Sequence, residues 1–120
     1  MAKILVIDDD PGVRDSVTRI LQREGHYVLP AEDGLEGVRL ARAHEPDLVI
    51  TDLIMPDQDG IETIQLLRDE FPALPIVAMS GGGSVEPTGP LADAELLGAD
   101  GALAKPFSIE ELRALIDRFV

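Results

Sequence analysis

Short strand-like apolar runs alternate along the chain with segments whose apolar residues recur at helical spacing. Runs such as Ile4–Ile7 and Leu48–Thr51 are bounded by polar residues, a pattern typical of strands buried on both faces of a parallel sheet. The pattern predicts strands over Lys3–Asp8, Tyr27–Leu29, Asp47–Asp52, Pro75–Ser80 and Gly101–Ala104. It predicts helices over Pro11–Glu24, Gly34–His44, Gly60–Glu70, Leu91–Leu97 and Ile109–Phe119.

The helix boundaries carry their own signals. Asp10 is a suitable N-cap for a helix that begins at Pro11, and Gly25 is a suitable stop. Ser108 with Glu111 three residues later is the pattern of a capping box, which predicts the start of the last helix.

Strand–helix units repeated in this way predict an α/β fold, a doubly wound five-stranded parallel sheet with helices on both faces. We expect the flavodoxin-like strand order 2-1-3-4-5, which places the binding crevice between the first and third strands. A length of 120 residues suits a single domain over residues 1–120.

Charge and composition narrow the classes of function. The chain has 10 Lys and Arg against 23 Asp and Glu, a formal net charge of −13, so we expect no direct binding to nucleic acid. It has no cysteine, which rules out disulfides and thiolate metal sites. No apolar run is long enough to span a bilayer. The predicted strand begins at Lys3, directly after Met1 and Ala2, which leaves no room for a signal peptide. We therefore expect a cytoplasmic protein with no membrane partner.

Charged side chains follow three of the predicted strands. Asp8 and Asp9 come directly after the first strand, Asp52 ends the third, and Lys105 follows the fifth. Because ligands of an open α/β sheet bind outside the carboxyl ends of the strands, we expect these groups at one edge. Carboxylates crowded together repel one another unless a hard cation lies between them, and Mg²⁺ is the expected cation.

Four segments at these strand ends carry a family resemblance. They read ILVIDDD, DLVITDLIMPDQDG, PIVAMSG and GADGALAKPFS, in this order along the chain. Together they resemble the receiver domain of two-component response regulators, over the whole length of the chain. The resemblance implies a module that is switched by phosphorylation.

The resemblance also implies a role for each site residue. Asp52 would be the phosphoacceptor, and Ser80 would contact the phosphoryl group. Lys105 would pair with Asp52 when the site is empty and with the phosphoryl group when it is occupied. The Mg²⁺ ligands would be Asp8, Asp9, Asp52 and the backbone carbonyl of Ile54, with Asp8 acting more through water than directly. In the family the peptide bond before the residue matching Pro106 is cis, which aims the lysine inward.

Partners and activity follow from the same resemblance. A histidine kinase or a phosphotransfer protein would donate the phosphoryl group, and a downstream protein of unknown identity would respond to the altered conformation. The chain would not be an enzyme beyond catalysing its own phosphorylation and dephosphorylation. Ala102 departs from the pattern, because family members commonly have an aromatic residue three positions before the lysine. With Ala102 there, we expect the switch to depend mainly on Ser80 and the glycine-rich loop over 81–90.

Other readings of the same residues stay open. An aspartate-nucleophile phosphatase uses a similar sheet and Mg²⁺, but it needs a second Asp where Ile54 stands. A flavin-binding domain would place a phosphate beside Asp8, Asp9 and Asp10, which would repel it without a metal. The chain could also be a receiver cut from a hybrid kinase or a larger regulator.

Overall fold

The structure is a computed structural model that describes residues 1–53, 60–81 and 98–120. In chain order the elements are β1 (Lys3–Ile7), α1 (Pro11–Arg23), β2 (Tyr27–Ala31), α2 (Gly34–His44), β3 (Leu48–Asp52), α3 (Gly60–Glu70), β4 (Ile76–Gly81), β5 (Gly101–Lys105) and α5 (Ile109–Asp117). The strands form one parallel sheet in the order β2-β1-β3-β4-β5, which confirms the predicted topology. The helix predicted over Leu91–Leu97 lies outside the described residues.

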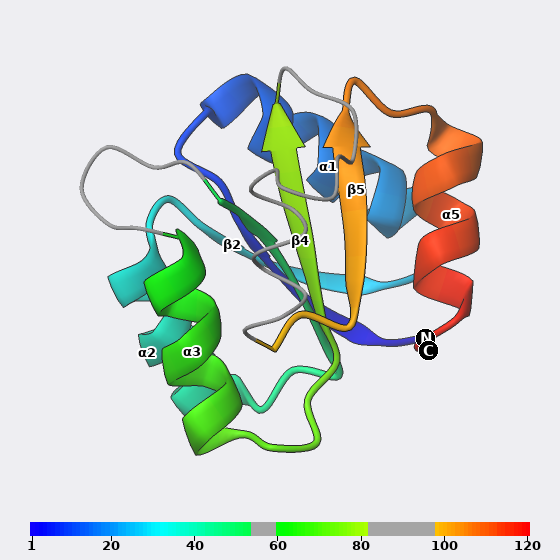
Figure 1. Cartoon of the computed structure of the whole chain (residues 1–120). Coiled ribbons are helices and arrows are strands. Elements are labelled where there is room, and N and C mark those ends of the chain that lie inside the picture. Colours follow the sequence, from blue (N-terminus) through cyan, green and yellow to red (C-terminus); the bar gives the residue numbers. More distant parts are fainter. Residues whose placement is uncertain (54–59, 82–97) are drawn as a thin grey trace.

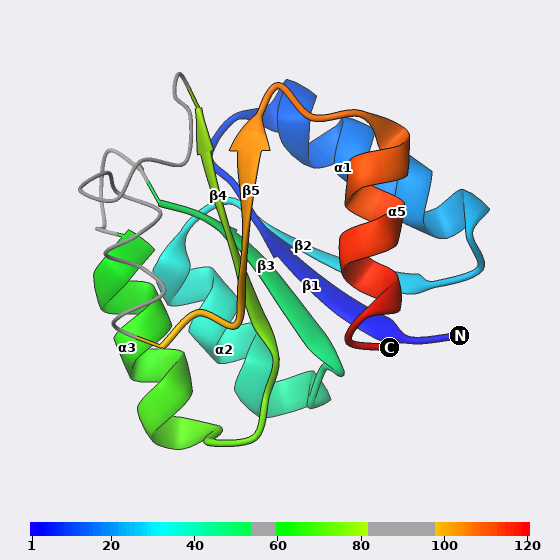
Figure 2. The same cartoon turned by 45° about the vertical axis from the view of Figure 1, so that its right-hand side comes forward.

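Helices cover both faces of the sheet. Helices α1 and α5 lie on one face, and α2 and α3 lie on the other (Figures 1 and 2). The carboxyl ends of β4 and β5 lie at one end of the molecule, and both chain termini lie at the opposite end. The end of the sheet where the site was predicted is therefore remote from the termini.

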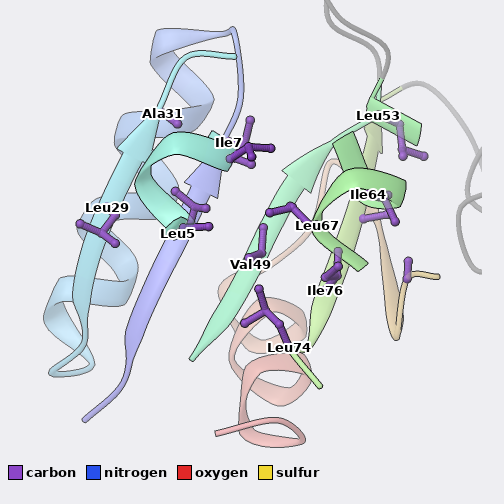
Figure 3. Close-up of a cluster of buried hydrophobic side chains, with 14 residues drawn as sticks. Leu5, Ile7, Leu29, Ala31, Val49, Leu53, Ile64, Leu67, Leu74 and Ile76 are labelled. Atoms are coloured by element: carbon purple, nitrogen blue, oxygen red, sulfur yellow. The ribbon is translucent and has the colours of Figure 1, made fainter. Parts of the chain in front are cut away.

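Each face of the sheet has its own hydrophobic core, because successive strand residues point to opposite sides. Leu5 and Ile7 of β1 pack toward α2 and α3 in one cluster (Figure 3), whereas Ile4 and Val6 pack toward α1 and α5 in the other. Gly37 lets α2 approach β1 closely, since a Cβ atom there would lie 2.3 Å from Cδ1 of Ile7.

The helix ends follow the predicted signals. Asp10 caps α1 by accepting hydrogen bonds from Gly12 N at 2.8 Å and Val13 N at 3.3 Å. The capping box of Ser108 and Glu111 is present at the start of α5. These caps fix the starts of the two helices that lie beside the carboxyl ends of β1 and β5.

One strand boundary differs from its prediction by more than a residue. Strand β2 continues to Ala31 instead of ending at Leu29. Tyr27 N–H and Ala31 C=O bond to the β1 side, so the backbone groups of Val28 and Pro30 face the open edge of the sheet. A proline at such a position costs no hydrogen bond of the sheet, which is why the strand can pass through Pro30.

Arg68, near the end of α3, links this helix to the segment before β4 and to the segment before β5, at the amino-terminal end of the sheet. It donates to the carbonyl oxygens of Pro72 at 2.9 Å, Leu74 at 2.8 Å and Gly98 at 2.7 and 3.1 Å. It also pairs with Asp100, just before β5, at 2.5 Å. Arg68 therefore ties the entrances of β4 and β5 to α3.

Candidate metal and phosphoacceptor site

Three carboxylates meet at the carboxyl end of the sheet, as the sequence predicted. Asp8 and Asp9 follow β1, Asp52 ends β3, and β1 pairs directly with β3. One oxygen of each carboxylate lies within 4.8 Å of the other two. Asp8 and Asp52 are buried, whereas Asp9 is exposed. The group thus combines two buried charges with one that faces solvent.

Asp8 is completely buried and its polar groups are hydrogen-bonded. Its N–H donates to Ala31 O at 3.1 Å. Its Oδ1 accepts from Asp10 N at 2.9 Å, and its Oδ2 accepts from Lys105 Nζ at 2.8 Å. Because both carboxylate oxygens are occupied, Asp8 is suited to hold a cation through water or after Lys105 moves.

Lys105 ends β5 and extends into the carboxylate group. Its Nζ lies 2.8 Å from Asp8 Oδ2 and 3.4 Å from Asp52 Oδ1. We expected Lys105 to pair with Asp52, but its shorter contact is with Asp8. Burial lowers the pKa of Lys105, but the hydrogen bond that it donates to Asp8 and the charges of both carboxylates outweigh this effect and raise the pKa overall. The side chain therefore stays a cation, and the bond from Lys105 to Pro106 is cis, as the resemblance implied.

The electrostatic environment of Asp52 disfavours its ionised form when no cation other than Lys105 is nearby. Burial is the main cause and raises the pKa of Asp52, and the charge of Asp8 raises it further. Lys105 and the N–H of Leu53 act in the opposite direction but do not cancel the increase. A divalent cation bound beside Asp52 would favour the carboxylate form, which is the form that can act as a nucleophile.

Ser80 lies at the same edge of the sheet. It is buried in β4, next to the end of β3, where Asp52 is the partner of Met79, and it pairs in register with Ala104 of β5. Ala102 is a half-buried residue of β5 that packs against the α2 and α3 side. The carbonyl of Ile54 and the loop predicted to switch over 81–90, apart from Gly81, lie outside the described residues.

The sequence did not single out Arg14, which also contacts the site. Its Nη1 donates to the backbone oxygen of Asp8 at 2.7 Å. The signal available was its spacing, since Arg14 lies four residues after the N-cap Asp10 and its side chain can reach back over the helix start.

The donor set fits a hard divalent cation. Carboxylate oxygens are the ligands that Mg²⁺ prefers, and Mg²⁺ commonly uses one or two of them with several waters. Asp9 and Asp52 would be the direct ligands, and Asp8 would contact the cation through water.

Among residues 1–53, 60–81 and 98–120, no helix is long and apolar enough to cross a membrane.

Comparisons with known proteins agree with this arrangement. A family model described as the response regulator receiver domain matches residues 4–117. The response regulator MprA of Mycobacterium sp. (strain KMS) is 42% identical over 120 residues, covering 97% of this chain and 51% of that protein. Protein PilH of Pseudomonas aeruginosa is 47% identical over 55 residues, which is 46% of each protein. The chain thus spans about half the length of the curated relatives it matches.

Solved structures show the same fold. A structure of the chemotaxis protein CheY4 of Vibrio cholerae has a TM-score of 0.90 and 32% identity, and the match covers 100% of this chain and 99% of that one. NtrX of Brucella abortus has a TM-score of 0.91 and 32% identity, over 98% of this chain and 26% of that one.

Proposed function

The chain belongs to the response regulator receiver domain family, and from this membership and the site geometry we propose that Asp52 is its phosphoacceptor in two-component signalling. The observation that carries the proposal is the position of Asp52. It is buried at the end of β3, beside two further carboxylates and within 3.4 Å of a lysine ammonium group. The nucleophile, the candidate Mg²⁺ ligands and the lysine ammonium group that would bind the phosphoryl group therefore lie together.

The chemistry needs few groups. A carboxylate oxygen of Asp52 attacks phosphorus, and the bond from phosphorus to the imidazole nitrogen of a phosphohistidine donor breaks as it does so. The electron pair of that bond stays on the nitrogen, and the product is an acyl phosphate on Asp52. Bound Mg²⁺ would supply positive charge to the phosphoryl oxygens. Lys105 supplies a second positive charge, and Asp9 and Asp52 would hold the Mg²⁺, with Asp8 acting through water.

We assign Ser80 to the reading of the product. A hydroxyl can donate a hydrogen bond to a phosphoryl oxygen, and Ser80 lies on β4, between the strands that carry Asp52 and Lys105. A phosphoryl group would therefore attract both Lys105 and Ser80 toward Asp52, and this change would be the signal that a downstream protein reads.

The partners and location belong to the same proposal. The donor is a histidine kinase or a phosphotransfer protein in the cytoplasm, and the recipient of the signal is a protein partner. The chain catalyses only its own phosphorylation and dephosphorylation. We do not favour the phosphatase reading, because it requires an aspartate where the sequence has Ile54.

The test is a mass measurement. The protein is incubated with acetyl phosphate and Mg²⁺, and intact mass is followed over time. We expect one phosphoryl adduct in the parent and in Asp69→Asn, a control at an exposed aspartate of α3. We expect no adduct in Asp52→Ala or in excess EDTA. An adduct of equal yield in Asp52→Ala or in EDTA would overturn the proposal.

A further inference from the structure

The side chain of Arg14 contacts the acidic loop from the helix that follows it. Arg14 is in the first turns of α1, and its own N–H bonds to Asp10 O at 2.9 Å. Its guanidinium returns over the helix start, and Nη1 donates to Asp8 O at 2.7 Å. The side chain is half-buried there. Arg14 thus holds a backbone group of the loop and leaves the carboxylates to other partners.

The carbonyl that Arg14 holds belongs to the peptide unit between Asp8 and Asp9. A peptide unit is planar, so a fixed carbonyl oxygen also fixes the N–H and the Cα atom of Asp9. The other side of this unit is held too, because Asp8 N–H bonds to Ala31 O and Asp8 Oδ1 accepts from Asp10 N. The direction in which the Asp9 side chain leaves the backbone therefore depends on these bonds.

Asp9 has no comparable support for its side chain. It is the exposed member of the three carboxylates, and no group in the described part of the chain donates a hydrogen bond to it. Its carboxylate nevertheless has an oxygen within 4.8 Å of the oxygens of Asp8 and Asp52. Its orientation must come from the backbone, and Arg14 is the side chain that holds that backbone.

We propose that Arg14 is a positioning residue that orients Asp9 toward the cation by fixing the peptide between Asp8 and Asp9. The proposal rests on the cation site of the proposed function and adds a residue to it. Groups behind metal ligands typically change metal affinity by 10- to 100-fold when they are removed.

Electrostatics alone predicts the opposite change in Mg²⁺ affinity when Arg14 is removed, which makes the proposal testable. A guanidinium near a cation site repels the cation, so loss of its charge alone should tighten Mg²⁺ binding. Loss of the hydrogen bond should loosen Mg²⁺ binding, because Asp9 is then free to point elsewhere. The direction of the change in affinity tells the two effects apart.

The experiment is calorimetric titration of Mg²⁺ into the unphosphorylated protein at fixed pH and ionic strength. We expect Arg14→Leu to weaken Mg²⁺ binding by about tenfold. Arg14→Lys should stay within about threefold of the parent, because a single donated hydrogen bond is within the capacity of an ammonium group. Arg19→Leu, the same change at an exposed position of α1, controls for the lost charge and should leave affinity unchanged.

A second measurement reports on the loop without metal. Hydrogen exchange at the amides of Asp9 and Asp10 in EDTA should be faster in Arg14→Leu than in the parent and in Arg19→Leu. If Arg14→Leu does not fold, Arg14→Gln takes its place, with the same expected direction. Unchanged or tighter Mg²⁺ binding in the folded variant would overturn the role of Arg14, as would equal losses in Arg14→Leu and Arg14→Lys. Failure of the parent to bind Mg²⁺ would instead overturn the cation site itself.

Discussion

Lys105 Nζ is hydrogen-bonded to Asp8 Oδ2 at 2.8 Å, although the two residues are 97 positions apart in the chain. The contact links the end of β5 to the loop after β1, across the intervening strands β3 and β4. Asp8 is fully buried, and the side chain of Lys105 is 18% exposed. The pair therefore places a compensated charge in the interior, next to the nucleophile.

We predict that Lys105→Ala destabilises the cation-free protein by about 3 kcal/mol, because removal of one partner leaves a buried charge uncompensated. Saturating Mg²⁺ should recover more stability in this variant than in the parent, since the bound cation replaces the missing positive charge. Urea unfolding with EDTA and with Mg²⁺ measures both effects. Lys3→Ala removes an ammonium group that makes a solvent-exposed hydrogen bond to His44 O; this variant is the control and should change little. Equal stability losses in the two variants would contradict this account.

The raised pKa of Asp52 predicts how stability depends on pH. Burial, the largest cause, makes the folded state hold the proton of Asp52 more tightly than the unfolded state does. The contribution of Asp52 to the stability of the cation-free protein therefore falls as pH rises from about 4, the ordinary aspartate pKa, through the folded pKa, and this loss persists at neutral pH.

Asp52→Asn removes the unfavourable ionised carboxylate from the folded state, so in EDTA we expect the variant to have a higher Tm than the parent at pH 7. The difference in Tm should shrink as the pH falls toward about 4, where Asp52 of the parent becomes protonated in both the folded and the unfolded state. Thermal unfolding across this range provides the measurement. A variant less stable than the parent at pH 7 in EDTA would show that the carboxylate is favourable in the folded state.

Gly37→Ala should destabilise the protein by about 1 kcal/mol. Alanine gains about 1 kcal/mol in helix propensity over glycine, but overpacking of a core costs about 1–3 kcal/mol. Here the added Cβ would lie 2.3 Å from Cδ1 of Ile7, which is fully buried, so the side chain or the helix must shift within a packed core. Ile7→Val removes Cδ1, so Gly37→Ala should cost less in that background. Denaturant unfolding of both single variants and the double variant gives the coupling, and strictly additive losses would contradict the clash.

Arg68→Lys should cost about 2 kcal/mol, because an ammonium group cannot make the five hydrogen bonds that the guanidinium makes to four residues. Arg39→Lys, at an exposed arginine of α2, is the matched control and should stay within about 0.5 kcal/mol of the parent. Urea unfolding measures the free energy of unfolding of both variants and of the parent. No difference between the two variants would mean that the Arg68 network adds nothing to stability.

The strands and their order were predictable because the signals are local or topological. Buried parallel strands read as apolar runs, and strand ends in such a sheet share one edge. For this reason the meeting of Asp8, Asp9 and Asp52 followed from the sequence. The continuation of β2 through Pro30 did not, because a proline ends a strand unless its backbone faces an open edge, and that depends on the neighbouring strand.

Side-chain partners were the harder part. The sequence placed Lys105 at the site but not its shorter contact to Asp8, which depends on distances across several strands. It also gave only the spacing from Asp10 as a signal for Arg14, and it gave no signal for Arg68. Both act by donating to backbone carbonyls, and such acceptors carry no signature in a sequence.

Pro30 also limits how the molecule can assemble with others. A peptide that adds to a sheet is held by alternating donors and acceptors along the edge strand. On the outer side of β2, Val28 offers an N–H group but Pro30 has none, so an incoming strand would lose a rung of its ladder there. This edge is therefore protected against strand exchange and fibril-like growth. A partner that approaches it must recognise side chains rather than extend the sheet.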